Sequence, residues 1–262
     1  GFLLLVLMAA GTGIYYGIAS QHKDPIVLTG YLGGEKIGFI EDPEIQEILE
    51  DEYGVILDYS KAGSLDMVTL NQEGQDYLFP SSQTALEYYR EEWGEPRKSE
   101  IILNTPIVLY THRMVADAFI KEGLIEEADG VYYMDMEKMA GIIMDGISWE
   151  EIGLPQLYGN VSIDTTDPSK SNSGNMFAGL LANALNGGET VTEEQLPQIL
   201  ADLTDIFSRL GYMETSSSDL FSQFLKMGVG AKPVIAGYES QILEFSVENP
   251  DDFAAVKDDI VM

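Results

Sequence analysis

The chain has 262 residues, 45% of them hydrophobic, which is enough apolar material for one large domain or two lobes of ordinary size. Its 44 Asp and Glu residues outnumber 14 Lys and Arg residues, and the formal net charge of -30 would repel a nucleic-acid backbone, so we expect no nucleic-acid partner. Because the sequence holds no cysteine, disulfides, thiolate metal sites and cysteine nucleophiles are excluded.

The N-terminal segment is uncharged and strongly apolar. Residues 2–19 contain no charged side chain and meet a polar break at Ser20, and Tyr15 and Tyr16 lie near one end of the run. Such a run is just long enough to span a bilayer, with tyrosines at the interface; the alternative is the apolar region of a signal peptide. We predict that residues 1–23 are a transmembrane anchor or signal segment. The remainder would then lie on the extracytoplasmic face of the cell membrane, anchored or secreted.

The next part of the chain alternates strand patterns with helical patterns. Strands are predicted over 25–29, 55–59 and 77–79, and helices over 42–53 and 85–93. This alternation predicts a mostly parallel sheet, in which the carboxyl ends of the strands share one edge and form the place where ligands bind. Small or polar residues accompany each strand end, and we take these as candidate ligand-binding residues: Thr29, Gly30, Lys36, Gly63, Ser64, Ser81 and Ser82.

A proline interrupts the long apolar run over residues 101–110. Proline cannot donate to a strand ladder, so a strand containing one lies at an edge or changes sheets. We therefore interpret Asn104-Thr105-Pro106 as the crossing between two lobes. The predicted division is a first lobe over 24–106, a second lobe over 107–247 and a return towards the first lobe over 248–262.

A small-polar loop in the second lobe precedes a helix. An alternating strand carrying Val161 and Ile163 is predicted to end at Thr165, and an Ala- and Leu-rich helix is predicted to begin near Ser173. Free N–H groups and the positive end of a helix dipole bind anions. The loop residues that would share a ligand with them are Asp167, Ser169, Lys170, Ser171 and Ser173. The alternative is an ordinary loop in which Asp and Ser only cap the helix.

Catalytic and cofactor motifs are missing from the sequence. His22 and His112 are the only histidines, which leaves too little material for a His-based zinc site or a catalytic triad. No nucleophile elbow, P-loop or complete dinucleotide fingerprint follows a predicted strand. We therefore expect a binding protein that is not an enzyme and that uses no cofactor and no metal.

The order of these parts resembles the extracellular solute-binding proteins of ABC transporters, the type II periplasmic binding proteins, and is most similar to their molybdate- and sulfate-binding branch. The resemblance rests on the apolar leader, the polar turns named above, the Asn104-Thr105-Pro106 crossing, the segment from Asp167 to Gly174, and Gly237-Tyr238-Glu239-Ser240. The similarity lies in the order of strands, loops and helices over residues 25–247. Two departures are an anchor without a lipobox cysteine and a final segment that would leave the return to the first lobe incomplete.

The resemblance implies a two-lobed α/β fold with the ligand cleft between the lobes, preceded by the N-terminal hydrophobic helix. It implies capture of a small ligand, an oxyanion by similarity, for delivery to an ABC transporter permease. It adds Tyr238 and Glu239 to the candidate ligand-binding residues. Lys36, Lys61 and Lys170 are the cations best placed to assist, and the alternative for each is a solvated loop lysine. Alternatives are a membrane-tethered sensor or interaction module, an enzyme using the same cleft, and a larger organic or peptide ligand that contacts Tyr31, Tyr59, Phe79 and Tyr238.

Overall fold

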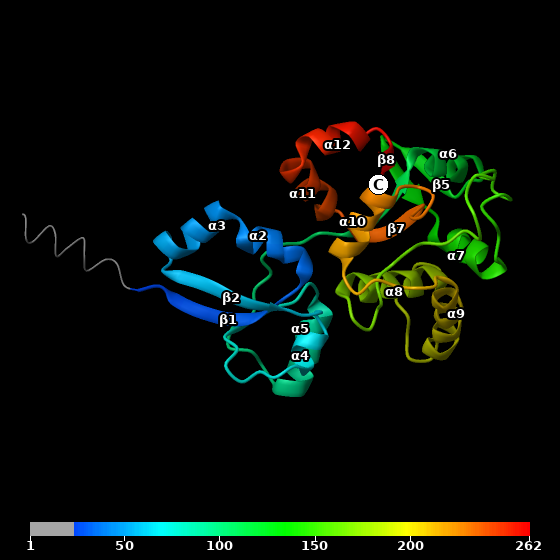
Figure 1. Ribbon diagram of the computed structural model, residues 1–262. Helices are drawn as coiled ribbons and strands as arrows, with labels where there is room; N and C mark the ends of the chain where they lie inside the picture. Colours follow the sequence, from blue (N-terminus) through cyan, green and yellow to red (C-terminus); the bar gives the residue numbers. More distant parts are fainter. Residues whose placement is uncertain (1–23) are drawn as a thin grey trace, which may run out of the picture.

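The computed structural model describes residues 24–262 and shows a mixed α/β chain with two lobes (Figure 1). Residues 24–93 build the first lobe, residues 107–262 build the second, and residues 94–106 join them. The anchor or signal segment predicted over residues 1–23 lies outside the described residues. Among residues 24–262, no helix combines the length and the apolar character needed to cross a membrane.

The first lobe is a three-stranded parallel sheet with helices around it. Its strand order is β2-β1-β3, so the prediction of a parallel sheet is confirmed for this lobe. The strands are β1 (Ile26–Leu32), β2 (Val55–Lys61) and β3 (Tyr77–Phe79). The helical segments are η1 (Gly34–Lys36), α2 (Ile37–Glu41), α3 (Pro43–Glu47), the single π-turn η2 (Ile48–Glu52), α4 (Asp66–Thr69) and α5 (Gln83–Trp93). Because all three strands run the same way, their carboxyl ends meet at one edge.

The second lobe has an antiparallel sheet of order β7-β4-β8, so the prediction of mostly parallel strands is wrong here. Alternating strand and helix patterns do not fix strand direction, which depends on the end at which the chain re-enters the sheet. The strands are β4 (Ile107–His112), β7 (Val234–Tyr238) and β8 (Ile260–Val261), and β5 (Ile125–Ala128) with β6 (Val131–Met134) forms a separate hairpin. The helices are α6 (Arg113–Lys121), α7 (Met136–Asp145), α8 (Asn172–Leu185), α9 (Leu196–Arg209), α10 (Ser217–Met227), α11 (Ser240–Glu248) and α12 (Pro250–Val256).

Most of the apolar core belongs to the second lobe. Its larger cluster joins α6, α7, α8 and the following loops through buried residues such as Phe119, Met139, Trp149 and Phe177. A smaller cluster packs Tyr110 of β4 against the aromatic face of α10. Burial of this much apolar surface makes the second lobe the firmer support for any site at its edge.

The strand predicted to end at Thr165 is not a ladder strand. Val161 and Ile163 are each 1% exposed, but this segment pairs through two isolated bridges, Asp164 to Ile235 of β7 and Thr166 to Glu214. The prediction that Val161 and Ile163 are buried is confirmed. A ladder strand, however, also needs hydrogen bonds to a neighbouring strand along its length, and this segment has only isolated bridges. The bridges hold the loop before α8 beside the loop before α10.

The last residues of the chain lie in the second lobe. We expected residues 248–262 to turn back towards the first lobe, but β8 pairs with β4, and Ile260 and Val261 fill the open edge of that strand. The His112 ring nitrogen Nδ1 lies 2.9 Å from Asp259 Oδ2 beside this pairing. The division into domains that the sequence suggested stays a prediction.

Candidate ligand-binding site

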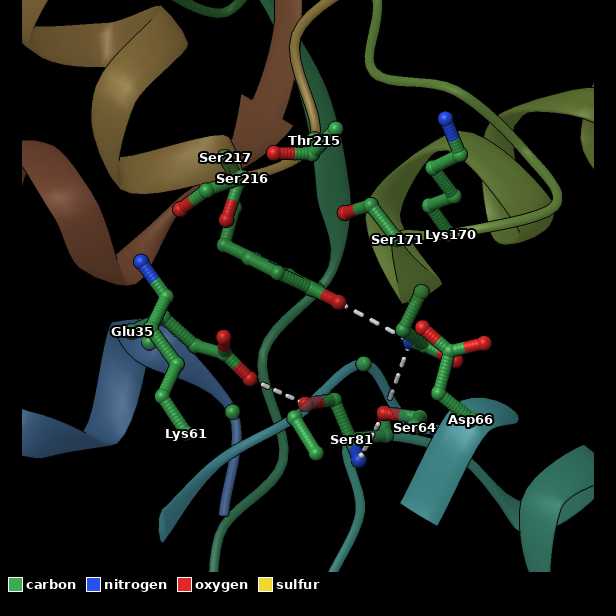
Figure 2. Close-up of a pocket in the computed structure, with 16 residues that line it drawn as sticks. Glu35, Lys61, Ser64, Asp66, Ser81, Lys170, Ser171, Thr215, Ser216 and Ser217 are labelled. Atoms are coloured by element: carbon green, nitrogen blue, oxygen red, sulfur yellow. Dashed lines mark hydrogen bonds between the residues drawn. The ribbon is translucent and has the colours of Figure 1, made fainter. Parts of the chain in front are cut away.

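A cavity of about 300 Å³ lies between the two lobes (Figure 2). This volume is at the lower end of the range of ligand pockets, about 300 to 1,000 Å³, and suits a small ligand. The first lobe contributes the turns at the carboxyl ends of its three strands, and the second contributes the starts of α8 and α10 and the end of β7. The lining residues are Gly33, Gly34, Glu35, Lys61, Ala62, Gly63, Ser64, Asp66, Ser81, Lys170, Ser171, Asn172, Thr215, Ser216, Ser217 and Tyr238.

The turns of the first lobe support one another. Ser64 Oγ, in the turn after β2, accepts a hydrogen bond of 2.9 Å from the N–H of Ser81, in the turn after β3. The Glu35 carboxylate folds back over Gly33, where an added Cβ would lie only 2.5 Å from Oε1. A side chain at position 33 would displace the Glu35 carboxylate from this place.

Two helices of the second lobe begin at the cavity. Ser171 is the N-cap of α8 and Ser216 is the N-cap of α10, and neither side chain caps its own helix. Ser171 Oγ shares a hydrogen bond of 3.1 Å with Ser173 Oγ, and both N-cap hydroxyls lie at the cavity, where a ligand could contact them. The first N–H groups of both helices have no partner within the helix, and the positive ends of the two dipoles add to the attraction for an anion.

The two lobes touch beside the cavity. Asn172 Nδ2 donates to the Ser81 carbonyl oxygen in the first lobe at 3.2 Å and to the Tyr238 hydroxyl in the second at 2.9 Å. The backbone at Gly63 lies so close to the Lys170 carbonyl oxygen that an added Cβ would overlap it. The structure therefore shows the lobes in a closed arrangement.

One carboxylate in the cavity is ionised and strongly bound. Lys36 Nζ donates to Glu35 Oε1 and to Ser81 Oγ, both at 2.5 Å, and Ser81 Oγ donates to Glu35. Burial on its own would raise the pKa of Glu35, but the charge of Lys36 and the hydrogen bonds from Lys36 and Ser81 outweigh it and hold the pKa below its usual value.

The lysines of the site are balanced by carboxylates. Lys61 and Lys170 line the cavity and Lys36 pairs with Glu35, while the carboxylates of this region belong to Glu35, Asp66 and Asp167, the last 3.6 Å from Lys170 Nζ. Three positive and three negative charges make this small region formally neutral within a chain of formal charge -30. An anion therefore meets less repulsion here than on the rest of the surface, and backbone N–H groups can add to its binding.

Tyr238 is a neutral hydroxyl at the base of the cavity. Burial raises its pKa to about 12, assisted by the nearby negative charge of Glu35. Its backbone is fixed on both sides: its N–H donates to Gln241 Oε1 at 2.9 Å, and its carbonyl accepts from the Tyr110 hydroxyl at 2.6 Å. The hydroxyl is thus a fixed hydrogen-bonding group rather than an ionising one.

An ion pair in the second lobe supports the segment that leads towards α8. Lys232 Nζ lies 2.9 Å from Asp164 Oδ1, and both side chains are largely buried. Burial raises the pKa of Asp164, with the Lys232 contact opposing the shift. Asp164 is also bridged to β7, so this pair fixes the segment that leads towards α8.

The structure brings together six of the residues predicted from the sequence: Gly63, Ser64, Ser81, Lys170, Ser171 and Tyr238. The other eight lie outside the cavity lining: Thr29, Gly30, Lys36, Ser82, Asp167, Ser169, Ser173 and Glu239. Whether each lining residue contacts a ligand stays a prediction.

Thr29 and Gly30 lie inside a strand instead of at its end. β1 continues to Leu32, so the turn that reaches the cavity begins at Gly33. The N–H of Thr29 donates to Asp76 Oδ2 at 3.0 Å, and Gly30 makes room for the carbonyl oxygen of Tyr77 on β3.

Several other predicted residues serve the structure around the cavity. Asp167 Oδ1 accepts from the N–H and the hydroxyl of Ser169, at 2.9 and 2.6 Å, and these bonds lower the pKa of Asp167. Ser173 is 2% exposed and shares a hydrogen bond of 2.7 Å with Thr166 below the loop. The buried Ser82 hydroxyl has no partner among the described residues, and the N–H of Glu239 donates to the Pro106 carbonyl oxygen.

Sequence reasoning missed several residues that line the cavity. Thr215, Ser216 and Ser217 precede α10 in the same small-polar pattern that pointed to the loop before α8, so that signal was present in the sequence. Glu35 and the others were hidden by the error in the end of β1 or by the ordinary frequency of charged residues in turns. Lys61 lines the cavity and was expected to assist binding as a cation. The missed residues are Gly33, Gly34, Glu35, Ala62, Asp66, Asn172, Thr215, Ser216 and Ser217.

No group of three or more His, Asp and Glu residues placed to hold a metal ion occurs within residues 24–262.

No protein-family model and no curated protein sequence matches the chain. Among solved structures, the sulfate-binding protein SubI from Mycobacterium tuberculosis H37Rv is similar, with 14% identity, a TM-score of 0.49, and coverage of 87% of this chain and 69% of that one. The periplasmic binding protein P5PA is similar with 12% identity, a TM-score of 0.40, and coverage of 81% and 63%. The function is therefore inferred from the cavity itself.

Proposed function

We propose that the chain is an extracytoplasmic solute-binding protein that captures a small oxyanion between its two lobes. The observation that supports it is the convergence of hydroxyls, two lysines and two helix N-termini on one small cavity between lobes that touch. A hydroxyl hydrogen can rotate to meet an anionic oxygen, and the free N–H groups at a helix N-terminus point towards one. Charge-assisted hydrogen bonds of this kind are the stronger ones.

Binding suits the cavity better than catalysis. Ser81 is a pocket serine with a lysine and a carboxylate beside it. Ser81 Oγ donates to Glu35, and Lys36 Nζ donates to both of them, so the three side chains are paired with one another. We therefore assign this triplet to fixing the turn.

Closure of the lobes would retain the ligand. Within residues 24–262 the chain crosses between the lobes through residues 94–106, where the N–H of Ser240 donates to Thr105 Oγ1 at 3.1 Å. Rotation about this segment would open the contact of Asn172 with Ser81, and ligand binding to both lobes would favour the closed state. Delivery of the ligand to an ABC transporter permease, from a chain held at the membrane by residues 1–23, completes the proposal.

The test is calorimetric titration of the chain with sulfate, molybdate and inorganic phosphate. We expect at least one of these to bind, and the double variant Lys61→Met, Lys170→Met to bind it at least about tenfold more weakly, because each lost charged hydrogen bond is worth about 1.5 to 3 kcal/mol. Lys226→Met removes an exposed lysine at the end of α10 and is the matched control. Unchanged affinity in the double variant, or binding of none of these anions, would contradict the proposal.

A further inference from the structure

One buried amide outside the cavity joins two of the elements that form its wall. Gln241, in the first turn of α11, is 5% exposed and is not among the lining residues. Its Oε1 accepts from the N–H of Tyr238 at 2.9 Å, and its Nε2 donates to the carbonyl oxygen of Ser217 at 3.0 Å. The side chain therefore ties the end of β7 to the start of α10, and each of these segments brings a side chain to the cavity.

The bridge through Gln241 continues across the cavity wall. The Tyr238 hydroxyl accepts from Asn172 Nδ2 at the start of α8, and Asn172 Nδ2 donates also to the carbonyl oxygen of Ser81 in the first lobe. Hydrogen bonds thus connect the start of α10, the end of β7, the start of α8 and the first lobe in one series. In this series Gln241 is the link that holds α10 to the rest.

The space for this amide comes from Gly237. A Cβ added at Gly237 would lie only 2.6 Å from Gln241 Oε1 and 3.3 Å from the Tyr110 ring. Gly237 belongs to the segment Gly237-Tyr238-Glu239-Ser240 that the sequence singled out, yet it does not line the cavity. Its absence of a side chain lets the Gln241 amide reach the end of β7.

The position requires a side chain that accepts at one end and donates at the other. The N–H of Tyr238 can only donate and the carbonyl oxygen of Ser217 can only accept, so the two ends of the amide cannot be exchanged. Methionine fills a similar volume but cannot donate, and an ionised glutamate can only accept. A protonated glutamate offers both functions, so it can restore the bridge.

We propose that Gln241 is a positioning residue for ligand binding, which holds the N-terminus of α10 in the place where it and the N-terminus of α8 contact the same ligand. The inference rests on the proposed function of the cavity. Gln241 touches no ligand and acts through Ser217 and Tyr238. Groups that are held in place before a ligand arrives bind it more tightly, because less freedom is lost on binding.

The experiment compares the full chain with Gln241→Met and Gln241→Glu by calorimetric titration with sulfate, molybdate and inorganic phosphate, between about pH 9 and about pH 5. Each affinity is taken relative to that of the unchanged chain at the same pH, which removes the titration of the anion itself. Gln241→Met should bind about tenfold more weakly at every pH, because the carbonyl oxygen of Ser217 has lost its donor.

Gln241→Glu should bind as weakly as Gln241→Met at the alkaline end and recover most of the affinity at the acid end. Burial favours the neutral carboxyl, and only the neutral form can donate to Ser217. Tyr110 and Tyr238 lie around this side chain and stay neutral over the range, because burial raises the pKa of both. Glu239 is common to all the forms compared. A side chain that only filled space would give no such pH profile.

Amide hydrogen exchange of the chain without an anion tests the same bridge directly. In Gln241→Met the N–H of Tyr238 and the first turn of α10 should exchange at least about tenfold faster, while α7 exchanges as before. Gln198→Met is the matched control, because it removes an amide that donates to Asp202 on the exposed side of α9. It should change neither exchange nor affinity.

Unchanged affinity or unchanged exchange in Gln241→Met would overturn the inference and leave the proposed function in place. A failure of Gln241→Glu to recover at acid pH would also contradict it, since the bridge would then not depend on the donor. Binding of none of the three anions to the unchanged chain would overturn the proposed function, and this inference with it.

Discussion

At the scale of single residues, close approach of two backbones decides where the lobes can meet. Gly63 lies in the turn after β2, and the carbonyl oxygen of Lys170, from the opposite lobe, occupies the place where a side chain would begin. The backbone of Gly63 is not in the left-handed region. The need for glycine therefore comes from the contact between the lobes and not from conformational strain.

Gly63→Val should consequently hold the lobes apart and leave each lobe folded. We expect oxyanion affinity to fall at least about tenfold, since the donors of the two lobes would no longer reach one ligand, while the melting temperature of the ligand-free chain changes little. Gly141→Ala is the control: it lies within α7, has no neighbour within 4 Å of an added Cβ, and should bind normally with equal or slightly higher stability. Normal affinity in Gly63→Val would show that the contact has no part in binding.

At the scale of elements, the sequence predicted which helices and strands exist better than it predicted where they end and which strands pair. Asp42 begins its helix as expected, its Oδ1 accepting from the N–H groups of Glu44 and Ile45, because a cap depends only on neighbouring residues. The end of β1 was placed short of Leu32, and Glu35 was missed with it, because strand length is set by pairing with β2 and β3. Pairings between distant segments leave no local pattern to read.

The first turn of α7 illustrates a local element whose stability depends on pH. Asp135 is its N-cap and Oδ1 accepts from the N–H of Lys138 at 3.1 Å, a bond that with the Lys138 side chain lowers the pKa of Asp135. Asp135→Ala should cost about 1 kcal/mol of unfolding free energy at neutral pH. Because the folded-state pKa is below the unfolded one, this difference should persist above the ordinary pKa of Asp and shrink as the pH falls through the folded value.

Urea unfolding of both forms from pH 7 to the acid limit of the folded chain measures that difference. Asp145→Ala removes the same charge from the opposite end of α7, where a carboxylate meets the negative end of the dipole. It should be neutral or slightly stabilising. An equal cost for the two substitutions would show that the effect is one of net charge and not of capping.

At the scale of the whole molecule, two opposing electrostatic effects act on an anionic ligand. The chain as a whole carries a formal charge of -30, while the cavity region is formally neutral, with Lys36, Lys61 and Lys170 balanced by the carboxylates of Glu35, Asp66 and Asp167. The electrostatic field of the whole chain acts on a ligand that is still in solution, whereas the contacts in the cavity act only on a ligand that has bound there. Approach and retention should therefore respond differently to ionic strength.

We expect the association rate constant for the anion to rise a few-fold as ionic strength increases from about 0.01 M to about 0.15 M, because the Debye length falls from about 30 Å to about 8 Å and the general repulsion is screened first. The dissociation rate constant should change much less, since the residues at the N-termini of α8 and α10, Asn172, Ser216 and Ser217, are buried and salt screens buried contacts less. Stopped-flow fluorescence at several concentrations of sodium chloride measures both constants, and an equilibrium competition with chloride shows whether chloride itself enters the cavity. An association rate that falls with salt would mean that Lys61 and Lys170 dominate the field at the mouth of the cavity, so that a ligand is attracted from a distance despite the acidity of the chain.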